Sequence, residues 1–330
     1  MIRFGPDDDL RPLPTRREVL AAAKRISGHV VRTPSLHAPR LSEASGCELI
    51  LKAENLQRVS AFKARGAINT LLQLSPAQRR QPIVTYSSGN HGQAVAWCAR
   101  ERGARVRVFV PEDVDPSKAR AIEAWGAELV LEGADCVETE NAARAHAAAT
   151  GASYVPPYND PVVIAGQGTC GYELAQQLPE VDALFVALGG GGLIAGMATY
   201  LRSVRPDLRV IGCSPERSPA LHECMKAGRV VDVPCHPTLS DATAGGVEPG
   251  AITVDLCKEL LDESLLVSEA QIADAMREYI DAHHQLIEGS AAVALAALKR
   301  ERARFKGQTT AVVICGGNIG RQKLVSVLNL

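Results

Sequence analysis

Hydrophobic and polar positions along the chain form two alternating patterns. Short, nearly continuous apolar runs are typical of buried strands, and the Ala-rich stretches between them have a helical period. The expected strands are 106–110 (VRVFV), 183–188 (ALFVAL), 208–212 (LRVIG) and 310–314 (TAVVI), and the clearest expected helices are 141–149 and 271–283. This alternation predicts an α/β fold with mainly parallel sheets that helices cover on both faces.

Turn chemistry at PPYNDP, residues 156–161, interrupts the alternation. We therefore expect two doubly wound open sheets, with a small α/β domain at 84–160 inserted into a large domain of 1–83 and 161–330. The chain has 330 residues, which is long enough for two cores.

Charge and composition exclude several classes of protein. With 36 basic and 37 acidic residues, no basic stripe and 4% aromatic residues, the chain does not resemble a nucleic-acid binder. No apolar run approaches the length of about 20 residues that spans a membrane. The N-terminal MIRFGPDDDL lacks the apolar core of a secretory signal, and nine scattered cysteines without a CxxC pair suggest reduced thiols. These observations predict a cytoplasmic location.

The first candidate for chemistry is Lys63, in the segment SAFKARGAI at 60–68. By itself this lysine is more simply interpreted as a solvated surface cation. Arg65, two residues further on, is expected to be structural.

A run of four glycines, GGGG at 189–192, follows an expected strand and opens into an expected helix. Backbone amides without side chains at a helix N-terminus form an anion cradle. A tight turn is the simpler alternative, and no Lys-Ser/Thr follows as in nucleoside-triphosphate loops. The loop also fits a dinucleotide fingerprint loosely, although Ser214 stands where an acidic residue is expected and Glu216 comes slightly later. An NAD-dependent oxidoreductase therefore stays as an alternative.

Two further loops follow expected strands. SSGNHGQA at 87–94 offers hydroxyls, amides and a helix start to a carboxylate or a ring oxygen, with ordinary helix capping as its alternative. His91 alone is more often structural. CGGNIG at 315–320 suggests close approach of the backbone to a ligand, although Cys315 could equally be a buried small hydrophobe.

Together, SAFKARGA, SSGNHGQA, GGGGL and CGGN resemble, in order and spacing, the pyridoxal-phosphate enzymes of the serine/threonine dehydratase and serine racemase family. AGQGT at 165–169 is a further segment of this kind, and the resemblance runs from about Pro34 to the C-terminus. It implies the tryptophan synthase β-like fold (fold type II), with pyridoxal 5'-phosphate as cofactor. Within this family, the chain could belong with the phenylserine dehydratases or with the dehydratases of hydroxyectoine utilisation.

The resemblance also implies roles for individual residues. Lys63 would hold the cofactor as a Schiff base, Phe62 would flank it, Asn90 would bond the ring hydroxyl, and Cys315 would face the pyridine nitrogen. The phosphate would be held by Gly189, Gly190, Gly191, Gly192 and Leu193. The substrate carboxylate would be held by the turn of Ser87, Ser88, Gly89, Asn90 and His91. Glu288, in EGSAA at 288–292, would be a further pocket residue, although a helix start explains that segment as well.

The implied activity is elimination from a β-hydroxy-α-amino acid, which gives a 2-oxo acid and ammonia. A lysine must form the imine and later act as base at the α-carbon, while the cofactor accepts the charge. A neutral group at the ring nitrogen favours elimination over transamination. Racemisation is the nearest alternative, because Lys63 and Ser88 on opposite faces could each move the α-proton. Relatives are commonly homo-oligomers, so we expect a dimer.

The chain departs from its relatives at two places. Metal-dependent relatives have two carboxylates and a carbonyl where Ser214, Ser218 and Ala220 stand, so we expect no divalent metal site, whereas a monovalent cation stays open. Many relatives read A-D-G where this chain has TAGGV at 243–247. Gly245 in place of the aspartate would leave room for a substrate bulkier than serine, such as phenylserine or a hydroxyectoine-derived amino acid.

Overall fold

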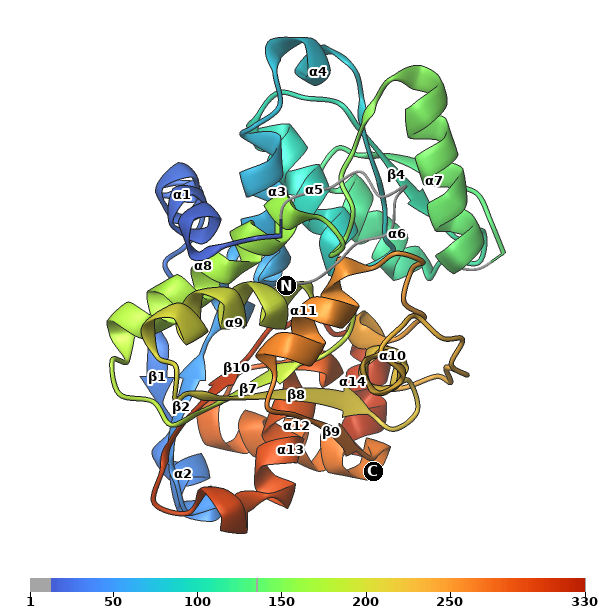
Figure 1. Cartoon of the computed structure of the whole chain (residues 1–330). Coiled ribbons are helices and arrows are strands. Elements are labelled where there is room, and N and C mark those ends of the chain that lie inside the picture. Colours follow the sequence, from blue (N-terminus) through green and yellow to red (C-terminus); the bar gives the residue numbers. More distant parts are fainter. Residues whose placement is uncertain (1–12, 135, 330) are drawn as a thin grey trace.

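The computed structural model describes residues 13–134 and 136–329, which form two sheets surrounded by helices (Figure 1). MIRFGPDDDL, interpreted above as no secretory signal, lies outside the described residues. Within them, no helix combines the length and the apolar character that crossing a membrane requires.

The larger sheet has six strands in the order β1-β2-β10-β7-β8-β9. Their bounds are β1 Ser35–His37, β2 Glu48–Lys52, β10 Thr309–Val313, β7 Ala183–Ala187, β8 Arg209–Pro215 and β9 Glu263–Val267. Only β1 runs antiparallel to its neighbour, and every other pair is parallel. The carboxyl ends of β7, β8 and β10 therefore open toward the same edge, where ligands of parallel sheets bind.

The smaller sheet is fully parallel and has the order β5-β4-β3-β6. Its strands are β5 Glu128–Leu131, β4 Val106–Val110, β3 Ile83–Tyr86 and β6 Ser153–Tyr154. All four lie between residues 83 and 154, in the stretch expected to form the inserted domain. The exact domain boundaries stay a prediction.

Helices alternate with the strands, as the hydrophobic pattern predicts. They are α1 Arg16–Ile26, α2 Pro39–Ser45, α3 Lys63–Leu71, α4 Pro76–Arg80, α5 Asn90–Glu101, α6 Pro116–Glu123, α7 Cys136–Thr150, α8 Pro161–Gln177, α9 Gly192–Val204, α10 Ala220–Ala227, α11 Ile252–Leu260, α12 Glu269–His283, α13 Gly289–Arg300 and α14 Arg321–Leu328. Short 3-10 turns are η1 Glu54–Leu56, η2 Arg58–Ser60, η3 Asp241–Thr243 and η4 Arg302–Phe305. The strand expected at 106–110 coincides with β4, and the other three expected strands shift by one to three residues at their ends.

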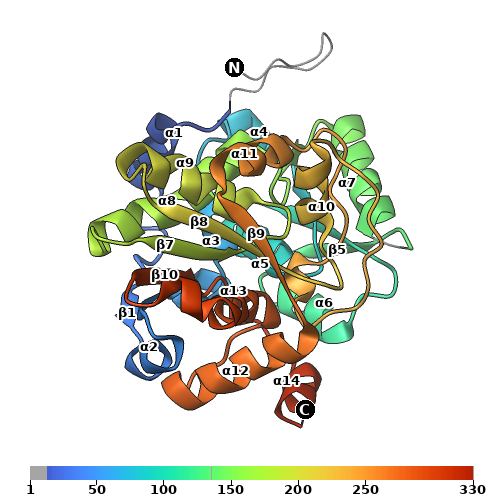
Figure 2. The same ribbon diagram turned by 60° about the horizontal axis from the view of Figure 1, so that its bottom comes forward.

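Both sheets are covered on two faces, so the predicted α/β fold with two doubly wound sheets is confirmed. In the larger sheet, α8 and α9 lie on one face and α12 and α13 on the other (Figures 1 and 2). In the smaller sheet, α5 packs into the same apolar cluster as α3, while α7 closes a separate cluster on the opposite face.

Glycines bring α8 into close contact with the two helices that open toward the site. A Cβ on Gly166 would lie 2.7 Å from the Cα of Gly66 in α3, and one on Gly196 of α9 would lie 2.3 Å from the carbonyl oxygen of Ile164. Larger residues at these positions would force the helices apart. The first turns of α3 and α9 are therefore held against the same rigid helix.

A buried ionic network lies beside α3. The guanidinium of Arg65 binds the carboxylates of Glu54, at 2.7 Å, and Glu173, at 2.8 Å, and Glu173 also binds Lys52 at 2.8 Å. Arg65 and Lys52 have no exposed side-chain surface. Two cations and two carboxylates balance one another inside the protein, so the structural role expected for Arg65 is confirmed.

Candidate active site

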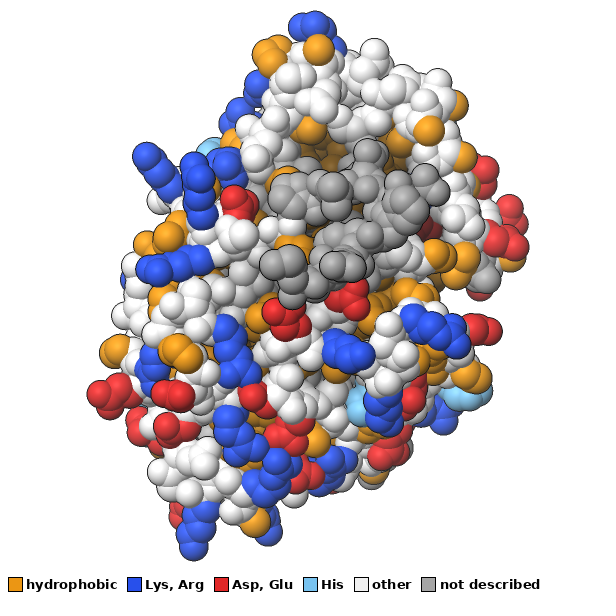
Figure 3. Space-filling model, in the orientation of Figure 1, with side chains coloured by type: hydrophobic (Ala, Val, Ile, Leu, Met, Phe, Trp, Pro, Cys, Tyr) orange, Lys and Arg blue, Asp and Glu red, His pale blue; other side chains and the backbone are white. Residues whose placement is uncertain are grey.

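A cleft of about 2190 Å³ lies between the two sheets. Every residue to which the sequence analysis assigned a cofactor or substrate role lines it: Phe62, Lys63, Ser87, Ser88, Gly89, Asn90, His91, Gly189, Gly190, Gly191, Gly192, Leu193, Gly245 and Cys315. Acidic and basic side chains are interspersed over the lower half of the face shown in Figure 3.

Lys63 is the first residue of α3, whose N-cap, Phe62, supplies no capping side chain. Gln167 of α8 takes over part of that task, because its side-chain oxygen accepts a hydrogen bond of 3.1 Å from the amide of Gly66. The Lys63 ammonium donates to the carbonyl oxygen of Pro157 at 2.6 Å. Burial lowers the pKa of Lys63 to about 8, although the charge of Glu288 opposes the shift. With this pKa, roughly a tenth of the amine is uncharged and nucleophilic at pH 7, far more than for an ordinary lysine.

The glycine run forms the turn between β7 and α9. Gly191 is the N-cap of α9 with φ +86, a left-handed conformation that favours glycine. A Cβ on Gly190 would lie 2.4 Å from the ring of Tyr158, and one on Gly189 would lie 2.9 Å from the Cα of Thr243. The absence of side chains thus lets Tyr158 and Thr243 pack directly against the glycine backbone, and the first amides of α9 have no partner within the helix. This geometry suits a phosphate dianion.

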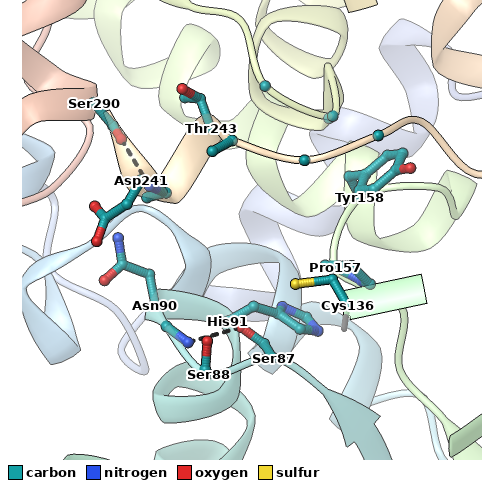
Figure 4. A pocket seen from close by; sticks show the side chains of 18 of the residues that line it. Ser87, Ser88, Asn90, His91, Cys136, Pro157, Tyr158, Asp241, Thr243 and Ser290 are labelled. Carbon is teal, nitrogen blue, oxygen red and sulfur yellow. Dashed lines mark hydrogen bonds between the residues drawn. The ribbon is translucent and has the colours of Figure 1, made fainter. Parts of the chain in front are cut away.

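The turn at 87–91 lies at the start of α5, on the wall opposite Thr243 and Tyr158 (Figure 4). The Ser87 hydroxyl accepts a hydrogen bond of 3.1 Å from the amide of Gly89, so Ser87 organises the turn itself. A ring nitrogen of His91 bonds the carbonyl oxygen of Val155 at 3.0 Å. Burial and the charge of Lys63 lower the pKa of His91 to about 3, so its imidazole is neutral.

Asn90 connects this turn to two segments that are distant in the sequence. Its amide nitrogen donates to both oxygens of Glu288, at 2.9 and 3.0 Å, and its amide oxygen accepts from Asn318 at 2.8 Å. Burial raises the pKa of Glu288 to about 7. The carboxyl group of Glu288 therefore lies in the pocket, rather than capping the helix that follows it.

Cys315 follows β10 and is buried, with 3% of its surface exposed. Burial, together with the charge of Glu288, raises the pKa of its thiol well above the ordinary value. The thiol is consequently neutral, as the sequence analysis expected of a group beside a pyridine nitrogen. Its carbonyl oxygen accepts a hydrogen bond of 3.1 Å from the amide of Phe62, which fixes the residue before Lys63 against β10.

The two departures from the family have local structural explanations. Gly245 has φ +117, so its backbone conformation favours glycine, and a Cβ there would meet no atom within 4 Å. Its amide donates to the Ser218 hydroxyl at 3.1 Å, while the Ser214 hydroxyl donates to the carbonyl oxygen of Leu188 at 2.8 Å. Among residues 13–134 and 136–329, no group of three or more His, Cys, Asp or Glu is arranged to hold a metal ion.

Sequence reasoning missed several polar groups of the cleft. Asp241 binds Lys118 at 3.0 Å and Lys323 at 2.9 Å, so a carboxylate does face the cleft although the expected aspartate position holds Gly245. The turn PPYNDP, which suggested only a chain reversal, also supplies the ring of Tyr158 that covers the glycine cradle. No local signal marks these side chains, because their partners are far away in the sequence.

A second ionic group lies on the same cleft. Arg144 of α7 contacts Glu140 and Glu248, and burial with the neighbouring Glu140 raises the pKa of Glu248 to about 7. The amide of Glu248 donates to the Tyr158 hydroxyl at 2.9 Å. The segment after Gly245 is thereby attached both to α7 and to the residue that covers the cradle.

Comparisons with known proteins agree with this geometry. A family described as "Pyridoxal-phosphate dependent enzyme" matches residues 26–316. The chain is 40% identical to the L-threonine ammonia-lyase of Geobacter sulfurreducens over 93% of this chain and 76% of the relative. It is 33% identical to an L-threo-3-hydroxyaspartate ammonia-lyase of a Pseudomonas species over 96% and 99% of the two chains. The serine racemase structure from Dictyostelium discoideum superimposes with a TM-score of 0.86 at 31% identity, over 93% of this chain and 99% of that one.

The oxidoreductase alternative is therefore wrong. Where the dinucleotide fingerprint requires a carboxylate, this chain has Ser214, near the end of β8, whose hydroxyl donates to the carbonyl oxygen of Leu188. By contrast, the open cradle, the buried lysine and the neutral thiol fit pyridoxal phosphate, whose phosphate, aldehyde and ring nitrogen need those three partners. The chain belongs to the family of pyridoxal-phosphate dependent enzymes, with the tryptophan synthase β-like fold that the sequence predicted.

Proposed function

We propose that the protein is a dehydratase that converts a β-hydroxy-α-amino acid to a 2-oxo acid and ammonia. The main support for the proposal is the Lys63 amine, which lines the same cleft as the glycine cradle. Burial lowers the pKa of this amine to about 8. Relatives that are named ammonia-lyases and that cover nearly the whole chain support it.

The residues of the cleft have separate roles in the proposed reaction. Bound pyridoxal phosphate supplies an electron sink for the charge that develops at the α-carbon. Lys63 anchors the cofactor and takes the α-proton on its side-chain nitrogen. The amides at the start of α5 hold the substrate carboxylate, and the four glycines with Leu193 hold the phosphate. The neutral Cys315 thiol would face the ring nitrogen of the bound cofactor and would not enforce its protonation.

The substrate we propose is bulkier than serine, such as phenylserine or a hydroxyectoine-derived amino acid. Open space around Gly245 and the size of the cleft support this assignment. A panel of serine, threonine, 3-hydroxyaspartate, phenylserine and a β-hydroxy diamino acid, followed by release of 2-oxo acid, tests it. Fastest turnover of a bulky member is expected, and best turnover of serine would refute the substrate assignment.

Racemisation is the second candidate, because the fold matches a serine racemase and the Ser88 hydroxyl lies on the cleft with Lys63. In this case Lys63 and Ser88 would each move the α-proton from one face. Chiral chromatography of recovered substrate separates the two activities, since a dehydratase leaves the unreacted enantiomer unchanged.

We further propose a cytoplasmic homodimer that needs no divalent cation and has room for a bound monovalent one. Nine scattered cysteines without a CxxC pair support a reducing compartment. Light scattering of the purified chain tests the dimer, and assays with exchanged monovalent salts test the monovalent cation.

A further inference from the structure

Glu288 occupies the N-cap position of α13 but does not cap it with its side chain. The side chain turns instead toward Asn90, with only 3% of the residue exposed. Gly316 makes this possible, because a Cβ there would lie 2.4 Å from a Glu288 oxygen. Within the described ranges Glu288 forms no ion pair with a cation. A buried carboxyl group without a cation is costly, which suggests that it serves the site rather than stability.

A chain of hydrogen bonds determines which end of the Asn90 amide faces Glu288. The Asn318 side-chain nitrogen donates both to the backbone carbonyl oxygen of Val59 and to the amide oxygen of Asn90, at 2.8 Å in each case. Because a backbone carbonyl only accepts, the atom of Asn318 that meets it must be nitrogen. The facing atom of Asn90 is then oxygen, and its nitrogen must face Glu288.

This series of hydrogen bonds ends at an unusual turn of the backbone. Val59 and Ser60 both have φ +52, which is rare outside glycine and costly for a β-branched residue. The turn presents the carbonyl oxygen of Val59 to Asn318 and that of Ser60 to the amide of Gly317, at 2.9 Å. It ends three residues before Lys63, so the strained turn ties the lysine segment to the loop after β10.

We propose that Glu288 and Asn318 are positioning residues that lock the amide of Asn90 with its second N–H directed to the cleft. An amide nitrogen has two hydrogens, and Glu288 accepts only one of them. The other is then available to the cofactor, and the 3-hydroxyl oxygen of pyridoxal phosphate, which the family resemblance assigns to Asn90, is the acceptor. This inference concerns the cofactor alone and holds whichever amino acid is the substrate.

Burial and the charges around Glu288 leave its carboxyl group partly protonated near neutral pH. Lys63 of α3, Asp241 of η3, Lys118 of α6 and the Cys315 thiol are its titratable neighbours. Burial raises the pKa of Glu288 to about 7, and Asp241 adds to the shift while Asn90 and Lys118 oppose it. A glutamine, which is neutral and of equal size, can therefore replace the acceptor that Glu288 offers to Asn90.

The test compares equilibrium binding of pyridoxal 5'-phosphate and of its analogue without the ring hydroxyl to the cofactor-free full-length chain. A hydrogen bond to this oxygen is worth about 1.4 kcal/mol, so the wild-type chain should bind the hydroxylated cofactor about tenfold more tightly than the analogue. Asn318→Ala and Glu288→Ala should reduce this ratio to about two or less. Below neutral pH, Glu288→Gln should keep the ratio of the two affinities near that of the wild-type chain.

Glu263→Ala is the control, because Glu263 pairs with Arg209 and Arg304 outside the cleft and should leave the ratio unchanged. Asn318 is exposed, so its variant is expected to fold even if Glu288→Ala does not. A purely structural role would weaken both ligands equally and leave the ratio near ten, which would overturn the proposal. Loss of the ratio in Glu288→Gln would overturn it as well.

Discussion

Two lysines of this protein, Lys52 and Lys63, lie eleven residues apart in the sequence but in opposite electrostatic settings. The Lys52 ammonium donates to Thr33, Glu173 and Gln177 at 2.7, 2.8 and 3.0 Å, inside the network around Arg65. Lys63 donates to one backbone carbonyl, has no carboxylate ion pair within the described ranges, and borders the cleft. A fully coordinated ammonium stabilises the fold, whereas an uncompensated one loses its proton readily and is free to react.

The largest expected effect is on catalysis at Lys63. Lys63→Ala should lower turnover by at least about a thousandfold, because both the anchor and the base are lost. The melting temperature of the cofactor-free chain should change little, since no ion pair is broken. Turnover by the purified variant within tenfold of wild type would show that the reactive amine lies elsewhere.

The reverse pattern is expected at the paired cations. Arg65→Met should lower the free energy of unfolding by about 3–5 kcal/mol, because Glu54 and Glu173 would remain buried without their partner. Urea unfolding measures this loss. Arg304→Met is the matched control, since Arg304 pairs with Glu263 and Glu301 at the surface and should cost about 0–1 kcal/mol. Equal losses in the two variants would contradict the contrast between the settings.

Substitutions in the glycine cradle are expected to have an intermediate effect, on the affinity for pyridoxal phosphate. A methyl group on Gly190 would meet the Tyr158 ring, whereas one on Gly246, which lines the same cleft, would meet no atom within 4 Å. Gly190→Ala should therefore weaken binding of pyridoxal phosphate about ten- to a hundredfold, and Gly246→Ala should change it less than threefold. Fluorescence titration of the cofactor-free chain decides between these outcomes, and an equal loss in both variants would argue against the cradle.

The pH dependence of cofactor uptake should separate Lys63 from an ordinary lysine. Only the neutral amine reacts, so the rate should rise with pH up to about 8 and level off above it. An unperturbed lysine, with a pKa near 10.4, would give a rate that still rises toward about pH 10. Stopped-flow absorbance over this range distinguishes the two curves.

The smallest expected effect is that of metal removal. The Ser214 and Ser218 hydroxyls are engaged with Leu188 and Gly245, and no carboxylate stands at Ser214, Ser218 or Ala220, where the resemblance places the ligands of metal-dependent relatives. Treatment with EDTA should leave the activity unchanged. A loss that added Mg²⁺ restores would show that a divalent site exists.

Local chemistry explains what the sequence could predict. The strand–glycine–helix order around 189–192 is encoded in neighbouring residues, and so is the helix start at Asn90. The contrast between Lys52 and Lys63 is different, because Glu173 lies 121 residues from the lysine that it neutralises. The same holds for Asn90 and Glu288, which are separated by 198 residues, and no local pattern shows that the carboxyl group turns away from its own helix.

Gly245 shows a different limit of sequence-based prediction, namely that a glycine can have more than one structural reason. Its position suggested that a missing carboxylate makes room for the substrate, and the space is indeed open. However, φ +117 provides a backbone reason for glycine that composition cannot reveal, and Asp241 brings a carboxylate to the cleft from four residues earlier.

Lys63, and not another buried amine, is expected to carry the cofactor. Borohydride reduction of the purified holoenzyme fixes the cofactor to the amine that holds it, and peptide mass spectrometry then locates the added mass. The label is expected on the peptide that contains Lys63 and not on the peptide that contains Lys52. A label on Lys52 or on any other lysine, with Lys63 unmodified, would contradict it.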